Sequence, residues 1–397
     1  MNIALIHPPV PQSEDENLLG VYPPLGLLWL SGNIPDHQVH IYDLRYHPLN
    51  ITDYDVVGIT CQTVSVPHCA DIAEKIHQET PDTIIVTGGH HPIPQDLLSF
   101  SQYVVQGEGE ITFQNLLHHI QGGPSCNSGI ISQTIATPDS APAHLPGLNP
   151  PNYDVEGISL TDYHPNQGAM ITSRGCPYNC LFCIAPFGHT WRGRTASQVQ
   201  ADAEELIARG APYLQILDDL FTFNRERVFD ICEKFNKLSI EWELPNGTRV
   251  DHVDHKMLTA MAASGCTRIL YGIESGVTHV LKTIRKNITL DQIKHAIKTT
   301  RSAGINPEGL FMVGNPGDTP ETIKKTVEFI KDLDITGHFS LATPYPGTDF
   351  WEWVKIHGTF LDVPYQNFER VPVFETPDFS AQERLDMLHW ASKECHS

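Results

Sequence analysis

The stretch Ser173-Arg174-Gly175-Cys176-Pro177-Tyr178-Asn179-Cys180-Leu181-Phe182-Cys183 contains three cysteines at C-x3-C-x2-C spacing. It follows a predicted strand, and its glycine and proline favour a loop. Three thiolates on one loop can bind three irons of a [4Fe–4S] cluster. The fourth iron is then open to a ligand that is not protein, which is typical of a cluster that takes part in chemistry. We therefore predict that Cys176, Cys180 and Cys183 are metal ligands at a catalytic centre.

Zinc is the alternative metal for such cysteines. Structural zinc usually takes four protein ligands in two separated pairs. The chain has nine cysteines, but those outside the loop form no second pair with suitable spacing. The spacing therefore favours the iron–sulfur cluster.

Length and composition predict a soluble globular protein of two to three domains. The chain has 397 residues, of which 40% are hydrophobic and 18% are charged. No stretch approaches the roughly 20 apolar residues of a membrane span, and the N-terminus is predicted to be a strand and not a signal peptide. The odd number of cysteines and the cluster motif favour a reducing compartment. We therefore expect a cytoplasmic protein with no membrane partner.

The chain is strongly acidic. It has 26 lysines and arginines against 47 aspartates and glutamates, which gives a formal net charge of −21. An acidic surface repels the phosphate backbones of RNA and DNA. We therefore expect no nucleic-acid partner.

Residues 1–122 alternate between short apolar strands and helical segments. This alternation predicts a doubly wound parallel sheet, that is, an N-terminal Rossmann-like α/β domain. Ligands of such sheets bind beyond the carboxyl ends of the strands, where glycines let a large flat ligand approach the backbone. The predicted strands are 3–7, 40–44, 56–60, 83–87 and 103–106. The candidate ligand-binding residues at their carboxyl ends are Pro8, Gln62, Thr87, Gly88, Gly89, Gly107 and Glu108.

Residues 166–349 contain a second series of strands and helices. Their order predicts a partial (β/α)6 barrel of TIM type, with the active site at the carboxyl ends of the strands. The predicted strands are 169–173, 213–218, 241–244, 268–273, 309–313 and 339–343. Besides the cysteine loop, the candidate residues at these ends are Asp218, Asp219, Arg249, Glu274, Ser275 and Gly314.

Two segments lack this α/β pattern. Residues 123–165 are rich in Pro, Ser, Asn and Gly and are predicted to form an extended linker. Residues 350–397 are rich in aromatic residues, with a short amphipathic helix near 382–393. We expect this tail to cover the open side of the barrel.

The barrel candidates also have structural interpretations. Asp218 and Asp219 could cap the helix that follows their strand, and Glu274 and Ser275 could likewise cap the helix after theirs. Arg249 could form an ion pair, although its guanidinium also suits a carboxylate ligand. The sequence leaves these alternatives open.

The motif Cys176-x3-Cys180-x2-Cys183, with the aromatic Phe182 before its last cysteine, resembles that of the radical S-adenosylmethionine (SAM) superfamily. The resemblance covers about residues 165–350. It implies that SAM binds the open iron, and that an electron from an external flavodoxin-type or ferredoxin-type reductant cleaves SAM to methionine and a 5′-deoxyadenosyl radical. That radical abstracts hydrogen from an unactivated carbon.

The same resemblance implies roles for the barrel residues. Asp218 and Asp219 match positions that contact the amino group of SAM, and a carboxylate pairs well with an ammonium. Glu274 and Ser275 match positions that hold the ribose hydroxyls. Three further residues complete the implied SAM site: Phe182 beside the cluster, Arg249 for a carboxylate, and Gly314 against the adenine.

A second resemblance covers the N-terminal region. Pro23-Pro24-Leu25-Gly26, Thr87-Gly88-Gly89-His90 and Gly107-Glu108-Gly109-Glu110 are similar to the cobalamin-binding domain of one radical SAM subfamily. In the barrel, Leu270-Tyr271-Gly272-Ile273-Glu274-Ser275-Gly276 and Met312-Val313-Gly314-Asn315-Pro316-Gly317 match that subfamily, whose members are mostly class B methyltransferases. The resemblance implies cobalamin as a third cofactor and methylation of an unactivated carbon in a small molecule or peptide of a biosynthetic pathway.

Three points stay open under this resemblance. Residues 8–26 contain no histidine and therefore lack the D-x-H-x-x-G motif that supplies a lower axial ligand in many cobalamin proteins. A domain of this type that no longer binds cobalamin is one alternative. A radical SAM enzyme that cyclises, rearranges or epimerises its substrate without methyl transfer is another, and a non-catalytic iron–sulfur or cobalamin sensor is a third.

Overall fold

The structure is a computed structural model that describes residues 1–9, 21–50, 54–126, 128–137 and 142–395. The chain forms two compact units. Of the described residues, unit 1 contains those within 1–9, 22–164 and Pro364–Asn367. Unit 2 contains Val21, Pro165–Val363 and the described residues from Phe368 onward.

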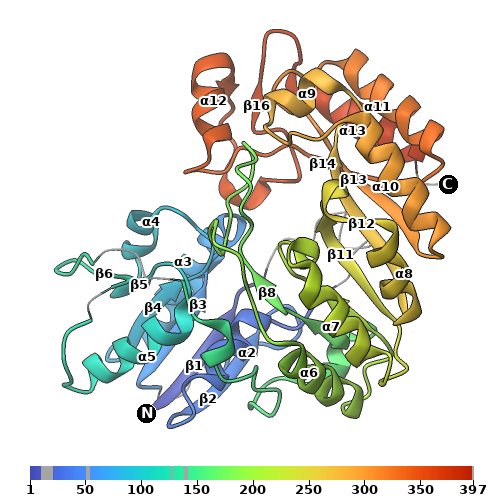
Figure 1. The fold of residues 1–397 in the computed structure, drawn as a ribbon. Coiled ribbons are helices and arrows are strands. Elements are labelled where there is room, and N and C mark those ends of the chain that lie inside the picture. The colour runs from blue at the N-terminus through green and yellow to red at the C-terminus, as the bar shows by residue number, and fades with distance from the viewer. Residues whose placement is uncertain (10–20, 51–53, 127, 138–141, 396–397) are drawn as a thin grey trace. The chain divides into compact units, whose positions relative to one another are not determined.

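Unit 1 is built on a six-stranded sheet with strand order β2-β1-β3-β4-β5-β6 (Figure 1). β1 to β5 run parallel, and β6 pairs antiparallel with β5. The five parallel strands confirm the predicted doubly wound α/β domain. The strands are β1 (Asn2–His7), β2 (Gln38–Asp43), β3 (Val56–Thr60), β4 (Ile84–Gly88), β5 (Tyr103–Val105) and β6 (Ile130–Ile131).

Successive residues of these strands pack on opposite faces of the sheet. On one face, Ile6 of β1 lies in a buried cluster with Cys69 of helix α3. On the other face, a Cβ atom at Gly58 of β3 would contact Leu5 and Phe113, so glycine leaves room for the Phe113 ring. The helices and 3-10 helices of this unit are α2 (Leu25–Gly32), η1 (Thr63–Ser65), α3 (Val66–Glu79), α4 (Pro94–Leu98), α5 (Gly109–Ile120), η2 (Leu145–Gly147), η3 (Leu160–Tyr163) and η7 (Tyr365–Asn367).

The segment predicted to be an extended linker is mostly irregular, but it packs on unit 1 as part of it. β6 extends the sheet, and η2 and η3 are its short helical turns. The Ile41 N–H donates to the Glu156 carbonyl (2.8 Å), and the Asn152 N–H donates to the Leu28 carbonyl (3.0 Å). These bonds satisfy backbone groups of the irregular segment, which explains how it packs without regular structure.

Unit 2 contains a six-stranded, all-parallel sheet whose strands are neighbours in chain order, β14-β13-β12-β11-β10-β7 (Figure 1). Consecutive order with intervening helices confirms the predicted partial (β/α)6 barrel. The predicted strand 169–173 is divided in two, because only its first residues pair with β10. The strands are β7 (Ala169–Met170), β10 (Leu214–Ile216), β11 (Trp242–Thr248), β12 (Cys266–Glu274), β13 (Asn306–Val313) and β14 (Gly337–Leu341).

The helices of unit 2 begin at well-formed caps. Thr195, Thr289 and Thr319 each accept a hydrogen bond from the backbone N–H three residues later, which satisfies a free donor of the first turn. Pro320 follows the last of these caps, at a position where proline favours a helix start. The helices and 3-10 helices are η4 (Asn166–Gly168), α6 (Ala196–Ala208), η5 (Phe221–Phe223), α7 (Arg225–Phe235), η6 (Val250–His252), α8 (His255–Ala263), α9 (Thr278–Thr283), α10 (Leu290–Ser302) and α11 (Pro320–Leu333).

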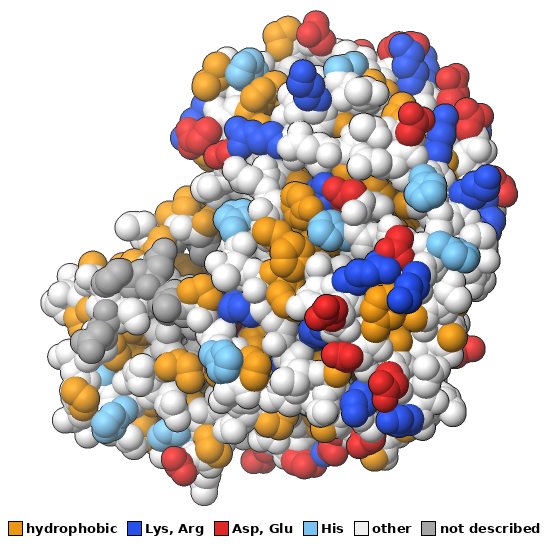
Figure 2. Space-filling model, viewed as in Figure 1, with side chains coloured by type: hydrophobic (Ala, Val, Ile, Leu, Met, Phe, Trp, Pro, Cys, Tyr) orange, Lys and Arg blue, Asp and Glu red, His pale blue; other side chains and the backbone are white. Residues whose placement is uncertain are grey.

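The chain after β14 folds into two helices and two short strands of unit 2, apart from η7. These are α12 (Asp349–His357), β15 (Thr359–Phe360), β16 (Phe374–Glu375) and α13 (Ala381–Cys395). α13 packs against α11 and β14, at the edge strand of the parallel sheet. Among the described residues, no helix has both the length and the apolar composition needed to cross a membrane. Figure 2 shows basic and acidic side chains interspersed on one face of the molecule.

Candidate functional site

The three cysteines lie on a loop that is closed by a two-residue strand pair. β8 (Ser173–Arg174) pairs antiparallel with β9 (Arg192–Gly193), so residues 175–191 leave and return at the same point. Gly175 begins the loop with φ 86°, and a Cβ atom there would lie 2.2 Å from the Thr190 carbonyl oxygen. Glycine is therefore required both by the backbone conformation and by the close passage of the returning chain.

Backbone hydrogen bonds fix the cysteines within this loop. The Cys176 N–H donates to the Gly188 carbonyl and the Cys183 N–H to the Cys180 carbonyl, both at 3.1 Å. Cys176 and Cys180 are half-buried, and Cys183 is exposed. Together these surroundings raise the pKa of the Cys183 thiol to about 11: loss of solvent around the sulfur has the largest effect, the charges of Cys180 and Cys176 add to it, and a hydrogen bond from the Ala185 N–H opposes it.

The three thiols thus interact electrostatically with one another, and a positively charged group such as an iron–sulfur cluster would stabilise their thiolate forms. Among the described residues, no set of three or more His, Cys, Asp or Glu side chains surrounds a position for a single metal ion. The donor set of three thiols on one closed loop fits a cluster in which each cysteine binds a different iron.

Asp218 follows β10 at the rim of the barrel, but its carboxylate is used within the protein. It accepts hydrogen bonds from the Thr172 N–H, the Thr172 hydroxyl and the Ser173 hydroxyl, each at 2.6 Å. These three bonds occupy most of the acceptor positions of one carboxylate. Asp218 thus joins β10 to the start of the cysteine loop, and its contacts do not support the predicted bond to the amino group of SAM.

Asp219 lies beside the first residue of the cysteine loop. One carboxylate oxygen accepts the Gly175 N–H at 2.7 Å. Burial and, to a smaller extent, the charge of Asp218 raise the pKa of Asp219 to about 6, against the lowering effect of that hydrogen bond. Asp219 therefore anchors the loop and still presents a carboxyl group at the rim.

Arg249 follows β11, and its guanidinium packs on Tyr178 of the cysteine loop. Its Nε and Nη2 donate to the two carboxylate oxygens of Asp251, both at 2.9 Å, and its guanidinium lies 3.6 Å from the ring centroid of Tyr178. Nη2 also donates to the Lys286 carbonyl at 3.1 Å. The remaining nitrogen, Nη1, is buried and has no hydrogen-bond partner among the described residues. Arg249 thus forms an ion pair with Asp251, as the sequence allowed, and its Nη1 has no acceptor among the described residues.

Glu274 ends β12 in a left-handed conformation with φ 71°, which is unusual for a residue other than glycine. One of its carboxylate oxygens accepts the Lys286 ammonium at 2.9 Å, and both side chains are buried. Ser275 comes next, and its hydroxyl accepts the Val277 N–H at 3.2 Å and lies 3.4 Å from the Thr326 hydroxyl. Ser275 thus stabilises a local turn but does not cap helix α9, whose N-cap is Val277. Glu274 has a second carboxylate oxygen for which no hydrogen bond is seen among the described residues.

Gly314 follows β13 and is glycine for a reason that the sequence did not reveal. A Cβ atom there would lie 2.3 Å from Nη1 of Arg384, which donates to the Gly314 carbonyl at 2.7 Å. The Arg384 guanidinium is buried, 4.0 Å from the Phe374 ring centroid and 4.9 Å from that of Phe379. The Cβ side of Gly314 is therefore occupied by a side chain of the tail. Phe182 is half-buried on the cysteine loop.

In unit 1, the predicted ligand-binding residues do lie at the carboxyl ends of parallel strands. Gln62 follows β3 and Gly107 follows β5, and both are exposed, with φ 76° at Gly107. Glu108 directly precedes helix α5. These three residues present polar and backbone groups at the edge where ligands of doubly wound sheets bind.

Four other predicted residues at this edge are buried or pack closely against neighbouring groups. The Thr87 hydroxyl is buried and lies 2.9 Å from the Ser101 hydroxyl. At Gly89, with φ 110°, a Cβ atom would lie 2.6 Å from the Cys61 carbonyl oxygen, so glycine permits two loops to pass closely. Pro8 is buried. Gly88 is half-buried, and a Cβ atom there would lie 3.3 Å from the Val105 carbonyl oxygen.

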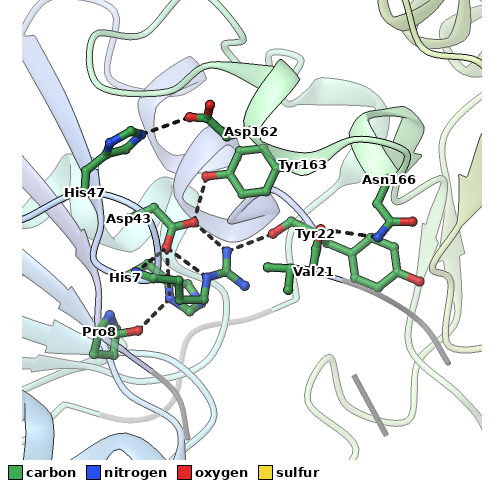
Figure 3. Close-up of polar contacts among 10 residues, drawn as sticks. His7, Pro8, Val21, Tyr22, Asp43, His47, Asp162, Tyr163 and Asn166 are labelled. Atoms are coloured by element: carbon green, nitrogen blue, oxygen red, sulfur yellow. Dashed lines mark hydrogen bonds and ion pairs between the residues drawn. The ribbon is translucent and has the colours of Figure 1, made fainter. Parts of the chain in front are cut away.

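A buried polar network lies where β1 and β2 end (Figure 3). Asp43 binds Arg45 through both carboxylate oxygens (2.8 and 2.6 Å) and accepts the Tyr163 hydroxyl at 2.7 Å. Arg45 also donates to the Tyr22 carbonyl at 2.8 Å. Burial and the Arg45 charge lower the pKa of His7 to about 4, and Nδ1 of His7 donates to the adjacent proline carbonyl at 2.9 Å.

Neither this network nor the Lys286–Glu274 pair could be predicted from a sequence motif. Tyr163 and Lys286 lie in segments without a motif, and each meets its partner only through the fold. The one available signal was the presence of charged residues inside or next to apolar strands, since a buried charge requires a partner.

The comparisons with known proteins agree with these two units. Residues 170–330 match the family model for the radical SAM superfamily, and residues 16–117 match that for the B12 binding domain. An uncharacterized methyltransferase of Pyrococcus horikoshii is 30% identical over 98% of this chain and 91% of its own length. An anaerobic magnesium-protoporphyrin IX monomethyl ester cyclase of Rubrivivax gelatinosus is 26% identical over 98% of this chain and 76% of its own length.

A solved structure is similar over most of the chain. The radical S-adenosylmethionine methyltransferase TsrM from Kitasatospora setae, with cobalamin and a [4Fe–4S] cluster bound, has a TM-score of 0.76. The match covers 91% of this chain and 81% of that chain at 18% sequence identity. At this identity the likeness is one of fold.

Proposed function

The chain belongs to the radical SAM superfamily, in the branch that carries a B12-binding domain, and on this premise we propose that it is a cobalamin-dependent methyltransferase. The proposed reaction is methylation of an unactivated carbon in a small molecule or peptide of a biosynthetic pathway. The observation that carries the proposal is the presence of both family matches in one chain whose three-cysteine loop lies at the barrel rim. The family implies a [4Fe–4S] cluster, SAM and cobalamin as cofactors.

We assign the cluster to Cys176, Cys180 and Cys183. Their closed loop, the hydrogen bonds of its backbone and the mutual repulsion of the thiolates support this assignment. When bound, the cluster and SAM supply a 5′-deoxyadenosyl radical, and cobalamin supplies the methyl group. We further propose that an external one-electron reductant of flavodoxin or ferredoxin type delivers the electron.

The proposed SAM contacts come from side chains that keep unused polar atoms at the rim. The buried Nη1 of Arg249, which lacks a partner among the described residues, suits the carboxylate of SAM. The second carboxylate oxygen of Glu274 suits a ribose hydroxyl, and the carboxyl group of Asp219 suits the amino group. Phe182 would pack beside them. Each residue thus binds and orients SAM, and none transfers a proton.

We propose that unit 1 binds cobalamin at the carboxyl edge of its parallel strands. The exposed Gln62 and Gly107 and the adjacent Glu108 are the candidate contacts there, with Gly88 and Gly89 shaping the edge through their close backbone packing. Pro8 follows β1 at the same edge.

Ring formation without methyl transfer is the second candidate function. It is favoured by the similarity to the magnesium-protoporphyrin IX monomethyl ester cyclase, which extends over nearly the whole chain. The cofactors and their residues would be the same, so only the products separate the two functions.

Product analysis tests the proposal. The protein is reconstituted anaerobically with iron, sulfide and hydroxocobalamin, and is then incubated with SAM, dithionite and candidate substrates. We expect bound cobalamin, 5′-deoxyadenosine and S-adenosylhomocysteine, and the loss of 5′-deoxyadenosine in Cys176→Ala but not in Cys232→Ala, a buried cysteine of α7. Failure to bind cobalamin would contradict methyl transfer. 5′-Deoxyadenosine without S-adenosylhomocysteine would favour the second candidate.

A further inference from the structure

The segment after helix α9 is hydrogen-bonded to the cysteine loop. The Leu181 N–H, between two cluster cysteines, donates to the Ile284 carbonyl at 3.0 Å. The Lys286 carbonyl accepts Nη2 of Arg249 at 3.1 Å. Arg249 in turn stacks on Tyr178 of the same loop. Residues 284–286 therefore hold the loop through two backbone carbonyls.

Lys286 is held in this segment by an unusual backbone. Its neighbours Arg285 (φ 57°) and Asn287 (φ 54°) both adopt the left-handed conformation, although neither is glycine. Its partner Glu274 does so as well, with φ 71°. A strained backbone conformation persists only where the surrounding structure holds it in place, and such conformations are concentrated at functional sites. Three such residues around one ion pair indicate that the position of the pair is specified.

The ion pair is buried against the strand beneath it. Lys286 is 5% exposed and Glu274 is 7% exposed, with 2.9 Å between the ammonium and the carboxylate oxygen. A Cβ atom at Gly272 of β12 would lie 3.0 Å from the ammonium and 2.9 Å from that oxygen. A buried ion pair is a poor source of stability compared with apolar packing, so its presence points to a role beyond stability.

The Lys286 ammonium also interacts electrostatically with Cys180, one of the proposed cluster ligands. Burial favours the neutral amine, but the charges of Glu274 and the Cys180 thiolate outweigh burial and raise the pKa of Lys286. Lys286 is therefore charged at neutral pH. The Cys180 thiolate acts on Arg249 in the same sense. The charges of two buried cations, Lys286 and Arg249, thus interact with one proposed cluster ligand.

We propose that Lys286 is a positioning residue that stabilises the reduced form of the cluster at Cys180, with Glu274 as the counter-charge that moderates the effect. The proposal rests on the proposed cluster. Reduction adds one electron, delivered by the one-electron reductant, and takes up no proton. A fixed ammonium beside the thiolate favours the more negative state, and a fixed carboxylate disfavours it.

The midpoint potential of the cluster tests this proposal without any turnover. The reconstituted full-length protein is titrated with dithionite and redox mediators in the absence of SAM, and the reduced cluster is quantified by electron paramagnetic resonance. We expect Lys286→Met to shift the midpoint to more negative potential and Glu274→Gln to shift it to more positive potential. Arg285→Met is the matched control, because it removes a cation one residue away that is exposed and paired with Asp349. Its midpoint should equal that of the wild type.

Opposite shifts separate an electrostatic role from simple damage to the loop, which would move both variants in the same direction. An unchanged midpoint in Lys286→Met at full iron content, or equal shifts in both variants, would overturn the proposal. If the Lys286→Met protein binds no iron, the midpoint potential of Glu274→Gln tests the proposal alone. A Glu274→Gln midpoint that is unchanged or more negative than that of the wild type would then overturn the proposal. A wild-type protein that forms no cluster would instead contradict the proposed function.

Discussion

Gly314 illustrates how a single residue acquires its identity from a neighbour that the sequence places far away. The Arg384 guanidinium occupies the space where a side chain would begin, and the backbone has φ 95°. We expect Gly314→Ala to lower the free energy of unfolding by about 2 kcal/mol more than Gly304→Ala, because a contact of 2.3 Å forces a buried side chain to move. Gly304 is the matched control, since it has φ 88° and open space around it.

Chemical denaturation of the two variants measures this difference. Equal losses in Gly314→Ala and Gly304→Ala would show that only the backbone conformation matters, which would contradict the role given to Arg384.

His7 makes the stability of unit 1 depend on pH. Burial and Arg45 lower its pKa from 6.5 to about 4 in the folded state. Between these values the unfolded chain binds a proton and the folded chain does not, so stability falls as the pH is lowered from 6.5 toward 4. The full effect is up to about 3 kcal/mol. This contribution to the free energy of unfolding is present above pH 6.5 and is lost by about pH 4.

His7→Asn is the variant that isolates this effect, because its side-chain amide can still donate to the Pro8 carbonyl and does not titrate. Unfolding is followed from pH 7.5 to 4.5 in both proteins. We expect the stability difference between wild type and variant to change across that window. A difference that is constant with pH would contradict the lowered pKa.

The three cysteines could be predicted from the sequence, because their ligand spacing is contained in one loop. The roles of Asp218, Thr87 and Ser275 could not. Each of these side chains is held by a hydrogen-bond partner that the fold or a local turn supplies, and a motif does not reveal whether an acceptor is already used. Arg249 combines both cases, since it forms an ion pair with Asp251 and its Nη1 has no acceptor within the part of the chain that the structure describes.

The division of the first barrel strand shows how one side chain shapes an element. β7 pairs with β10 only over its first residues, and Asp218 then takes the Thr172 N–H in place of a strand partner. The chain is thereby released to form β8, which pairs with β9 and closes the cysteine loop. Apolar periodicity predicted the six parallel strands, but a two-residue strand pair is too short to leave a pattern.

Asp218→Asn tests this link between strand and loop. The amide nitrogen cannot accept the Thr172 and Ser173 hydroxyls, so buried donors lose their acceptor. We expect a loss of about 1–3 kcal/mol in the free energy of unfolding and a lower iron content after reconstitution. Asp230→Asn, an exposed position on α7, is the control and should change neither quantity. An Asp218→Asn protein with wild-type stability and iron content would contradict the link.

The tail has a role in the whole molecule that its composition did not predict. Most of it belongs to unit 2, yet Pro364–Asn367 belongs to unit 1. Within unit 1, the Tyr365 ring lies 5.6 Å from the His91 ring, and its hydroxyl donates to Asp96 at 3.4 Å. From the sequence, we expected the whole tail to cover the barrel. An aromatic-rich composition does not specify which core a segment joins, so the place of residues 364–367 in unit 1 could not be predicted.

Tyr365 should therefore contribute to the stability of unit 1. We expect Tyr365→Ala to increase hydrogen exchange in helix α3 and to lower the free energy of unfolding by about 1–3 kcal/mol, because a packed ring is lost. Tyr365→Phe keeps the ring and should cost less than about 1 kcal/mol, since the lost hydrogen bond is long. Unchanged exchange in α3 for Tyr365→Ala would show that the segment does not support unit 1.

The central claim is that one chain holds a cluster on three cysteines of unit 2 and cobalamin on unit 1. Iron and cobalamin content after anaerobic reconstitution tests it most directly, in the wild type and in the triple variant Cys176→Ala, Cys180→Ala, Cys183→Ala. We expect about four irons and about one cobalamin per wild-type chain, and a triple variant that loses the iron but keeps the cobalamin. Iron retained by the triple variant, or no cobalamin bound by either protein, would contradict the claim.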